Sequence, residues 1–179
     1  GFGRLYVGTF LTSSNTLQIL LIDFVANSVT DLGLLSSSTT FMTVNNDGTL
    51  LYFLSLSEDA LIEKDLQGIQ ADRIIAEDFD EFDPFALSID EDFIFGISPS
   101  GENILRVEVA TGGPSQIIAG SGSTVYPPDP QVNVNSLSAV LVDISDLDMD
   151  NNGNLILTSL SSDRVFLLDL ERNVVSQIG

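Results

Sequence analysis

The chain has 179 residues, of which 44% are hydrophobic and 18% charged, so it can bury a core with fewer charges than the roughly 25% usual in soluble domains. Its 26 acidic and 6 basic side chains give a net charge of −20, which repels phosphate backbones and anionic lipids, so we expect neither nucleic acid nor a membrane as partner. The absence of Cys and His excludes disulfides, thiolate chemistry, imidazole bases and histidine-ligated metals.

Membrane and export signals are not expected in these residues. The longest strongly apolar stretch, residues 17–25, is interrupted by Asp23 and is far shorter than the ~20 residues of a membrane-spanning helix. The first four residues lack the basic start and apolar core of a signal peptide.

The opening part of the chain predicts three strands, at residues 3–9, 17–24 and 27–32. Short apolar stretches between polar turns are typical of strands. By comparison with the later repeats, these strands correspond to the second, third and fourth of a four-stranded unit. The first unit therefore lacks its inner strand.

Three further copies of one pattern follow, each with a polar turn, an apolar strand, a Ser-and-acid turn and an alternating strand. A strand precedes the polar turns at 41–44, 85–89 and 144–149, and an outer strand ends each unit at 73–75, 115–118 and 175–178. Gly3, Gly48 and Asp92 occupy equivalent positions 45 and 44 residues apart, within the ~40 to 50 residues of a propeller blade.

The last unit carries an insertion at about residues 122–142. It contains a Tyr-Pro-Pro-Asp-Pro segment at 126–130, for which we expect an extended polyproline-like loop. The apolar run at 138–142 is expected to form a spare strand.

Together these patterns predict an all-β fold: one propeller-type domain over 1–179, with about four four-stranded blades. The blades are placed at about 1–35, 36–80, 81–121 and 143–179, and the first lacks its inner strand. No segment has the spacing of a helix of convincing length.

The chain resembles the NHL, lactonase-type and YVTN-like β-propellers. Residues 5–9 (Leu-Tyr-Val-Gly-Thr) look like the first strand of lactonase-type propellers, and residues 83–90 and 147–155 look like the start of NHL-type blades. The resemblance implies a propeller architecture over essentially the whole chain. It does not imply an activity, because propellers include enzymes, adhesion modules and scaffolds.

Residues 148–153 satisfy the first six positions of a calcium-loop pattern. Asp148, Asp150 and Asn152 would supply hard oxygen ligands, and calcium is the one cofactor that the sequence leaves open. Ser159, however, stands at the twelfth position, where a bidentate Glu is expected. The other interpretation is a tight turn in which Asp and Asn cap backbone groups and Gly153 takes a positive φ.

Two further features have a functional and a structural interpretation. Five carboxylates at residues 77–83 could bind a divalent cation or a basic partner, or could form a solvated loop between blades. Tyr6, Tyr52 and Tyr126 could stack a sugar or a peptide, but the first two lie in predicted strands, where packing is the expected use. No catalytic residue is assigned.

Two functions from different classes follow. The first is a non-catalytic binding or structural module, extracellular or at the cell surface, that assembles with strands of other copies or of a longer polypeptide. The second is a calcium-dependent lactonase-like hydrolase. The extracellular expectation is based on the acidity, the single lysine and the Ser/Thr-rich loops.

Overall fold

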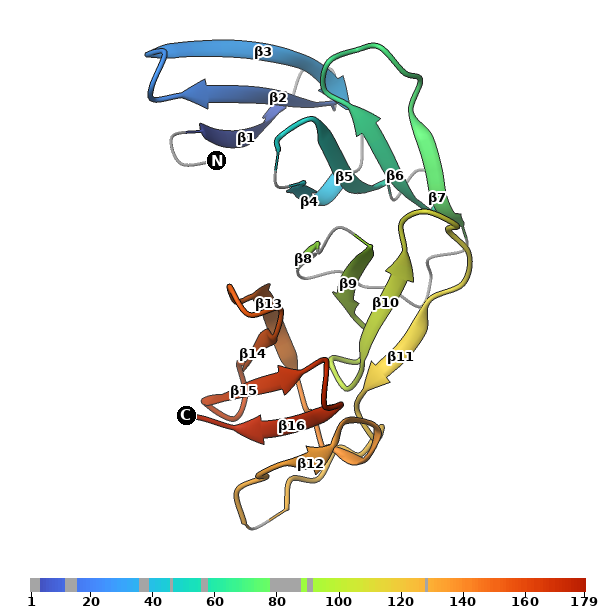
Figure 1. Ribbon diagram of the computed structural model, residues 1–179, viewed down its shortest axis with the longest axis vertical. Coiled ribbons are helices and arrows are strands. Elements are labelled where there is room, and N and C mark those ends of the chain that lie inside the picture. The colour runs from blue at the N-terminus through green and yellow to red at the C-terminus, as the bar shows by residue number, and fades with distance from the viewer. Residues whose placement is uncertain are drawn as a thin grey trace. The chain divides into compact units, whose positions relative to one another are not determined.

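The computed structural model describes residues 4–11, 16–35, 39–45, 47–55, 58–77, 88–89, 92–127 and 129–179. These residues form β-strands and one short 3-10 helix, and the strands assemble into four antiparallel sheets (Figure 1). No α-helix occurs in the described ranges, and none of their helical segments could cross a membrane. The predicted all-β fold is confirmed.

The chain divides into two compact units, Gly1–Glu77 and Asp78–Gly179. In the first unit, sheet 1 has the order β1-β2-β3 and sheet 2 the order β4-β5-β6-β7. Sheet 1 comprises β1 (Arg4–Leu11), β2 (Thr16–Asp23) and β3 (Ser28–Leu35). Sheet 2 comprises β4 (Thr39–Val44), β5 (Leu50–Ser55), β6 (Ala60–Asp65) and β7 (Arg73–Glu77). The described part of sheet 1 thus has the three strands predicted from the sequence.

Sheets 1 and 2 pack together through apolar side chains and one tyrosine. Ile19 of β2 is buried in a cluster with Leu51 and Phe53 of β5. The Tyr6 hydroxyl of β1 donates a hydrogen bond to the Gly48 carbonyl (3.1 Å) in the turn before β5. Gly48 has a φ of +74°, and a Cβ at this position would lie 2.5 Å from the Tyr6 hydroxyl oxygen, so the turn and the packing both require glycine.

The second unit contains sheet 3, with the order β11-β10-β9-β8, and sheet 4, with the order β12-β16-β15-β14-β13. Sheet 3 comprises β8 (Ser88–Ile89), β9 (Phe93–Ile97), β10 (Ile104–Glu108) and β11 (Gln116–Ala119). Sheet 4 comprises β12 (Val134–Asn135), β13 (Ile144–Met149), β14 (Leu155–Ser159), β15 (Arg164–Asp169) and β16 (Val174–Gln177). Residues 85–87 of the strand expected at 85–89 lie outside the described residues.

One buried cluster joins sheets 3 and 4. It includes Phe95 and Ile104 from sheet 3 and Leu157 and Phe166 from sheet 4. The turn after β9 contacts the start of β13, where the Ile144 amide donates to the Gly101 carbonyl (2.9 Å). Consecutive sheets within this unit therefore pack face to face, as blades of a propeller do.

The insertion contradicts one expectation: residues 138–142 are not a strand. The 3-10 helix η2 (Ser136–Ser138) occupies the start of this run, and the short strand β12 lies further upstream, paired with β16. The buried Gln131 side chain explains the difference, because its amide bonds both the N–H and the carbonyl of Val140 (2.7 Å each). A side chain thus satisfies the backbone groups that a neighbouring strand would otherwise pair.

Candidate functional site

The candidate calcium loop is the turn between β13 and β14. Asp150 accepts hydrogen bonds through Oδ1 from the backbone amides of Asn152 (2.8 Å) and Asn154 (2.9 Å), and through Oδ2 from Nδ2 of Asn154 (3.0 Å). The pKa of Asp150 is lowered from its usual 3.8. The hydrogen bond from the Asn154 side chain is the main cause, and the bond from the Asn154 backbone is the second. Both oxygens of this carboxylate are therefore used to shape the turn.

The other two predicted ligands have separate positions in this loop. Asp148 lies on β13 and accepts from the Met149 amide (2.8 Å), while Asn152 is exposed in the turn. Gly153 has a φ of +80°, as the turn interpretation requires. Within the described ranges, no group of three or more Asp, Glu, His or Cys side chains is placed to share a metal ion. Calcium binding at this loop stays one of the two interpretations.

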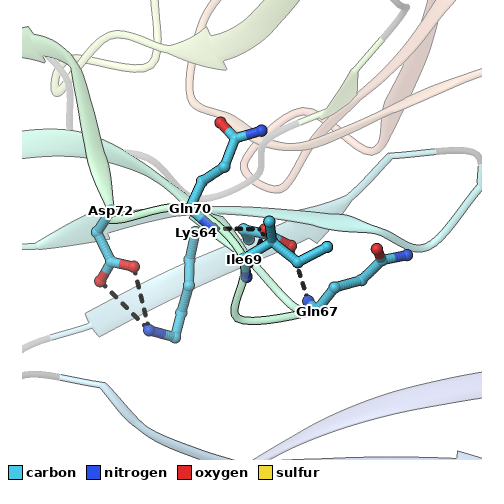
Figure 2. Close-up of polar contacts among 6 residues, drawn as sticks. Lys64, Gln67, Ile69, Gln70 and Asp72 are labelled. Carbon is cyan, nitrogen blue, oxygen red and sulfur yellow. Dashed lines mark hydrogen bonds and ion pairs between the residues drawn. The ribbon is translucent and has the colours of Figure 1, made fainter.

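Aspartates cap other turns in the same way. In the turn between β6 and β7, Asp65 accepts from the backbone amides of Gln67 (2.7 Å), Ile69 (3.0 Å) and Gln70 (2.9 Å). Figure 2 shows Gln67, Ile69 and Gln70 in this turn. These bonds, that from Gln67 above all, lower the pKa of Asp65. Lys64 closes the same turn through an ion pair with Asp72 (3.2 Å). Much of the acidity in the described turns thus has a structural use.

The acidic run at residues 77–83 is described only at Glu77, the exposed last residue of β7. Residues 78–83 lie outside the described residues. The two interpretations of this run stay open.

The tyrosines in strands are used in packing and hydrogen bonding. Tyr52 is buried in β5. This burial is the main cause of its raised pKa, and the nearby Glu63 carboxylate is the second cause. Glu63 in turn forms a two-bond ion pair with Arg73 (3.0 Å each). Tyr6 bonds the Gly48 turn, as described above. The expectation that these two residues serve packing is confirmed.

Tyr126 of the insertion organises a polar cluster that the sequence did not predict. Its hydroxyl donates to the Val142 carbonyl (2.9 Å) and lies 3.0 and 3.1 Å from the hydroxyls of Ser162 and Ser159. The Arg164 guanidinium lies over the Tyr126 ring, 4.2 Å from its centroid. These contacts attach the insertion to sheet 4, and no sequence spacing pairs residue 126 with residues more than 30 positions away.

The open edge of sheet 1 is the feature with the clearest capacity for binding. β1 pairs with β2 over all eight of its residues and is the terminal strand of its sheet among the described residues. Its counterparts in sheets 2 and 3, β5 and β9, are interior strands with a partner on each side. Backbone N–H and C=O groups along an unpaired edge can accept another strand.

Solved structures similar to this chain are β-propeller-like proteins. One, a nidogen/laminin complex, matches 100% of this chain and 62% of its own, with 14% identity and a TM-score of 0.67. An auxiliary nutrient binding protein from Bacteroides thetaiotaomicron matches 96% of this chain and 46% of its own, with 11% identity and a TM-score of 0.61. TolB from Acinetobacter baumannii matches 98% of this chain and 52% of its own, with 12% identity and a TM-score of 0.57. The chain thus spans less than two thirds of each.

These likenesses establish the architecture. The chain has an all-β, propeller-type fold, as predicted. Neither a protein-family model nor a curated protein matches it. The NHL-like or lactonase-like type therefore stays a prediction.

Proposed function

We propose that the chain is a non-catalytic, propeller-type module for binding or structural assembly, and that it accepts a strand from outside the chain at the open edge of sheet 1. The position of β1 carries the proposal. β1 has one partner strand in the described part of the chain, whereas its counterparts in sheets 2 and 3 are paired on both sides. Strand addition at such an edge gives affinity through main-chain hydrogen bonds.

The donor strand could come from three sources: residues 138–142 folding back, a longer polypeptide or a neighbouring molecule. The first is disfavoured because Gln131 already bonds the backbone of Val140, while Ala139 and Leu141 are buried in the core of the second unit. The limited share of each similar structure that the chain spans is consistent with a donor outside these residues.

At their identities of 11% to 14% the similar structures are evidence for the fold alone, and binding is proposed here by analogy with them. Two of them are described by what they bind: nidogen is in complex with laminin, and the Bacteroides protein is a nutrient binding protein. The proposal includes an extracellular or cell-surface location, based on the net charge of −20 and the single lysine.

Hydrogen exchange of the β1 amides tests the proposal, with β5 as the matched internal control. We expect the alternate β1 amides that point away from β2 to be protected at high protein concentration and to lose protection on dilution, because a separate molecule supplies the strand. The β5 amides should stay protected throughout. Alternate β1 amides that exchange freely at every concentration, or full protection in a stable 19.2 kDa monomer, would contradict strand addition from outside.

A further inference from the structure

We propose that Arg164 of β15 binds a carboxylate group from outside the chain, through the edge of its guanidinium that carries Nε and Nη2. The site lies within the second unit, so it goes beyond strand addition at β1 and does not depend on it. Three observations support it: this guanidinium has no partner, an aromatic ring holds it in place, and the same edge is occupied in two other arginines of the chain.

Arg164 is unpaired in a chain with a large excess of carboxylates. The other five basic side chains all have polar partners: Arg4 pairs with Asp23, Lys64 with Asp72, Arg73 with Glu63, Arg106 with Gln116 and Arg172 with Asp169. Arg164 has no hydrogen bond or ion pair in the described part of the chain, and its Nη1 nitrogen is buried without an acceptor. A charge that is partly withdrawn from water without a partner loses solvation free energy. A bound anion would supply the missing partner.

The other two nitrogens of this guanidinium face solvent. The Arg164 side chain is partly exposed, and of its unpaired nitrogens Nη1 alone is buried, so Nε and Nη2 are open to solvent. These two N–H groups lie on one edge of the planar guanidinium and match the two oxygens of a carboxylate. A carboxylate can therefore reach both donors without any rearrangement of sheet 4.

Tyr126 holds the guanidinium without using its N–H groups. The guanidinium carbon of Arg164 lies 4.2 Å from the centre of the Tyr126 ring. The ring is itself fixed, because its hydroxyl donates to the Val142 carbonyl (2.9 Å) and bonds the hydroxyls of Ser159 and Ser162 (3.1 and 3.0 Å). Stacking orients a guanidinium while leaving its edge donors free. An arginine oriented in advance loses less conformational entropy when it binds a ligand.

Sheets 2 and 3 show how this edge is used when a partner lies on the neighbouring strand. In sheet 2, Nε and Nη2 of Arg73 each donate to one carboxylate oxygen of Glu63 (3.0 Å each). In sheet 3, Nε and Nη2 of Arg106 both donate to Oε1 of Gln116, which lies opposite on β11 (3.3 and 3.2 Å). The chain thus already contains the two-bond carboxylate geometry that we propose for Arg164.

Sheet 4 has no such internal partner among its described residues. Gln177 is the counterpart of Gln116 on the outer strand, but it lies opposite Phe166, two residues along β15 from Arg164. Its Oε1 is buried and has no partner, so it does not accept from Arg164. Arg106 is likewise stacked on a ring, 4.6 Å from the centre of Phe93, but its edge is occupied. Arg106 is therefore the matched comparison for Arg164.

Two arguments favour a carboxylate over a phosphate as the ligand. Two parallel donors match the two oxygens of one carboxylate, as in the pair of Arg73 and Glu63. The net charge of −20 also repels a dianion more strongly than a monoanion. The carboxylate can belong to a free small molecule or to the C-terminus of a polypeptide, and the experiment below separates these two sources.

Nuclear magnetic resonance of the arginine side chains tests the proposal on the unaltered chain. The Nε–H signals of Arg164 and Arg106 are followed during additions of sodium acetate, sodium phosphate or the peptide acetyl-Ala-Ala, with sodium chloride holding the ionic strength constant. Arg164→Lys assigns the Arg164 signal and removes the two-donor edge while keeping the charge. Arg106→Lys is the matched control, because the edge of Arg106 is already occupied.

We expect the Arg164 signal to shift and to saturate at millimolar acetate, while the Arg106 signal does not move. Arg164→Lys should weaken acetate binding by about tenfold or more, measured by backbone amide shifts, and Arg106→Lys should leave it unchanged. Tighter binding of the peptide than of acetate would assign the carboxylate to a polypeptide terminus, and equal or weaker binding would assign it to a free small molecule.

Three results would overturn the proposal: no saturating shift at Arg164, an equal shift at Arg106, or tighter binding of phosphate than of acetate. If Arg164→Lys does not fold, the comparison of the two arginine signals in the unaltered chain still decides. Hydrogen exchange of the β1 amides is measured separately from these titrations. A failure at Arg164 would therefore leave the proposed function standing, and a failure of strand addition would leave the carboxylate site standing.

Discussion

At the scale of single residues, the aspartates that cap turns predict a loss of folding stability in acid that can be measured for one side chain at a time. The pKa of Asp150 is lowered by its bonds from Asn154, so this carboxylate stabilises the folded chain above its unfolded pKa of 3.8. That contribution is lost as the pH falls through the folded pKa. Asp150→Asn keeps an acceptor oxygen but does not titrate. We expect urea unfolding to show the native chain losing stability relative to Asp150→Asn below about pH 4. Stability curves that stay parallel down to about pH 2 would contradict this.

Calcium should have little effect on the same loop. Asp150 already accepts three hydrogen bonds, and the calcium-loop pattern lacks its bidentate Glu at Ser159. We therefore expect the melting temperature in millimolar calcium and in chelator to agree within about 1 °C, because a ligand stabilises only the state that it binds. A rise of several degrees that Asp148→Ala or Asp150→Ala removes would instead favour the calcium-dependent hydrolase.

At the scale of elements, the insertion depends on one buried amide. Gln131→Leu removes the partners of the Val140 N–H and carbonyl, and an unsatisfied buried polar group costs about 1–3 kcal/mol. We expect the free energy of unfolding to fall by roughly 2 kcal/mol in denaturant titration. Gln67→Leu, in an exposed turn, is the matched control and should change it by less than about 0.5 kcal/mol. Equal effects of the two substitutions would show that the Gln131 contact is not stabilising.

The sequence predicted the strands better than it predicted the insertion. Strands such as Ile144–Met149 and Arg73–Glu77 lie where repeated turns and apolar periods place them, because these signals are local. Residues 138–142 have the apolar pattern of a strand, but the contact with Gln131 overrides it, and no local rule reports such a contact. The cluster of Tyr126, Ser159 and Arg164 was missed for the same reason.

At the scale of the whole molecule, the net charge of −20 opposes any association of two copies. Salt screens this repulsion, since the Debye length falls from about 30 Å at 0.01 M to about 3 Å at 1 M. If main-chain hydrogen bonds at the edge of β1 hold the copies together, assembly should strengthen as salt rises over this range. Sedimentation at several salt concentrations measures this. Dissociation at high salt would mean that ion pairs hold the assembly instead.

We propose above that polypeptide from outside its own 179 residues completes this propeller-type chain. The most direct test is the solution mass of the unaltered chain by light scattering at moderate salt, read together with hydrogen exchange of Arg4–Leu11. We expect a particle of at least twice 19.2 kDa in which these amides are protected. A stable 19.2 kDa monomer with the same amides protected would contradict it, because the chain would then complete its own edge.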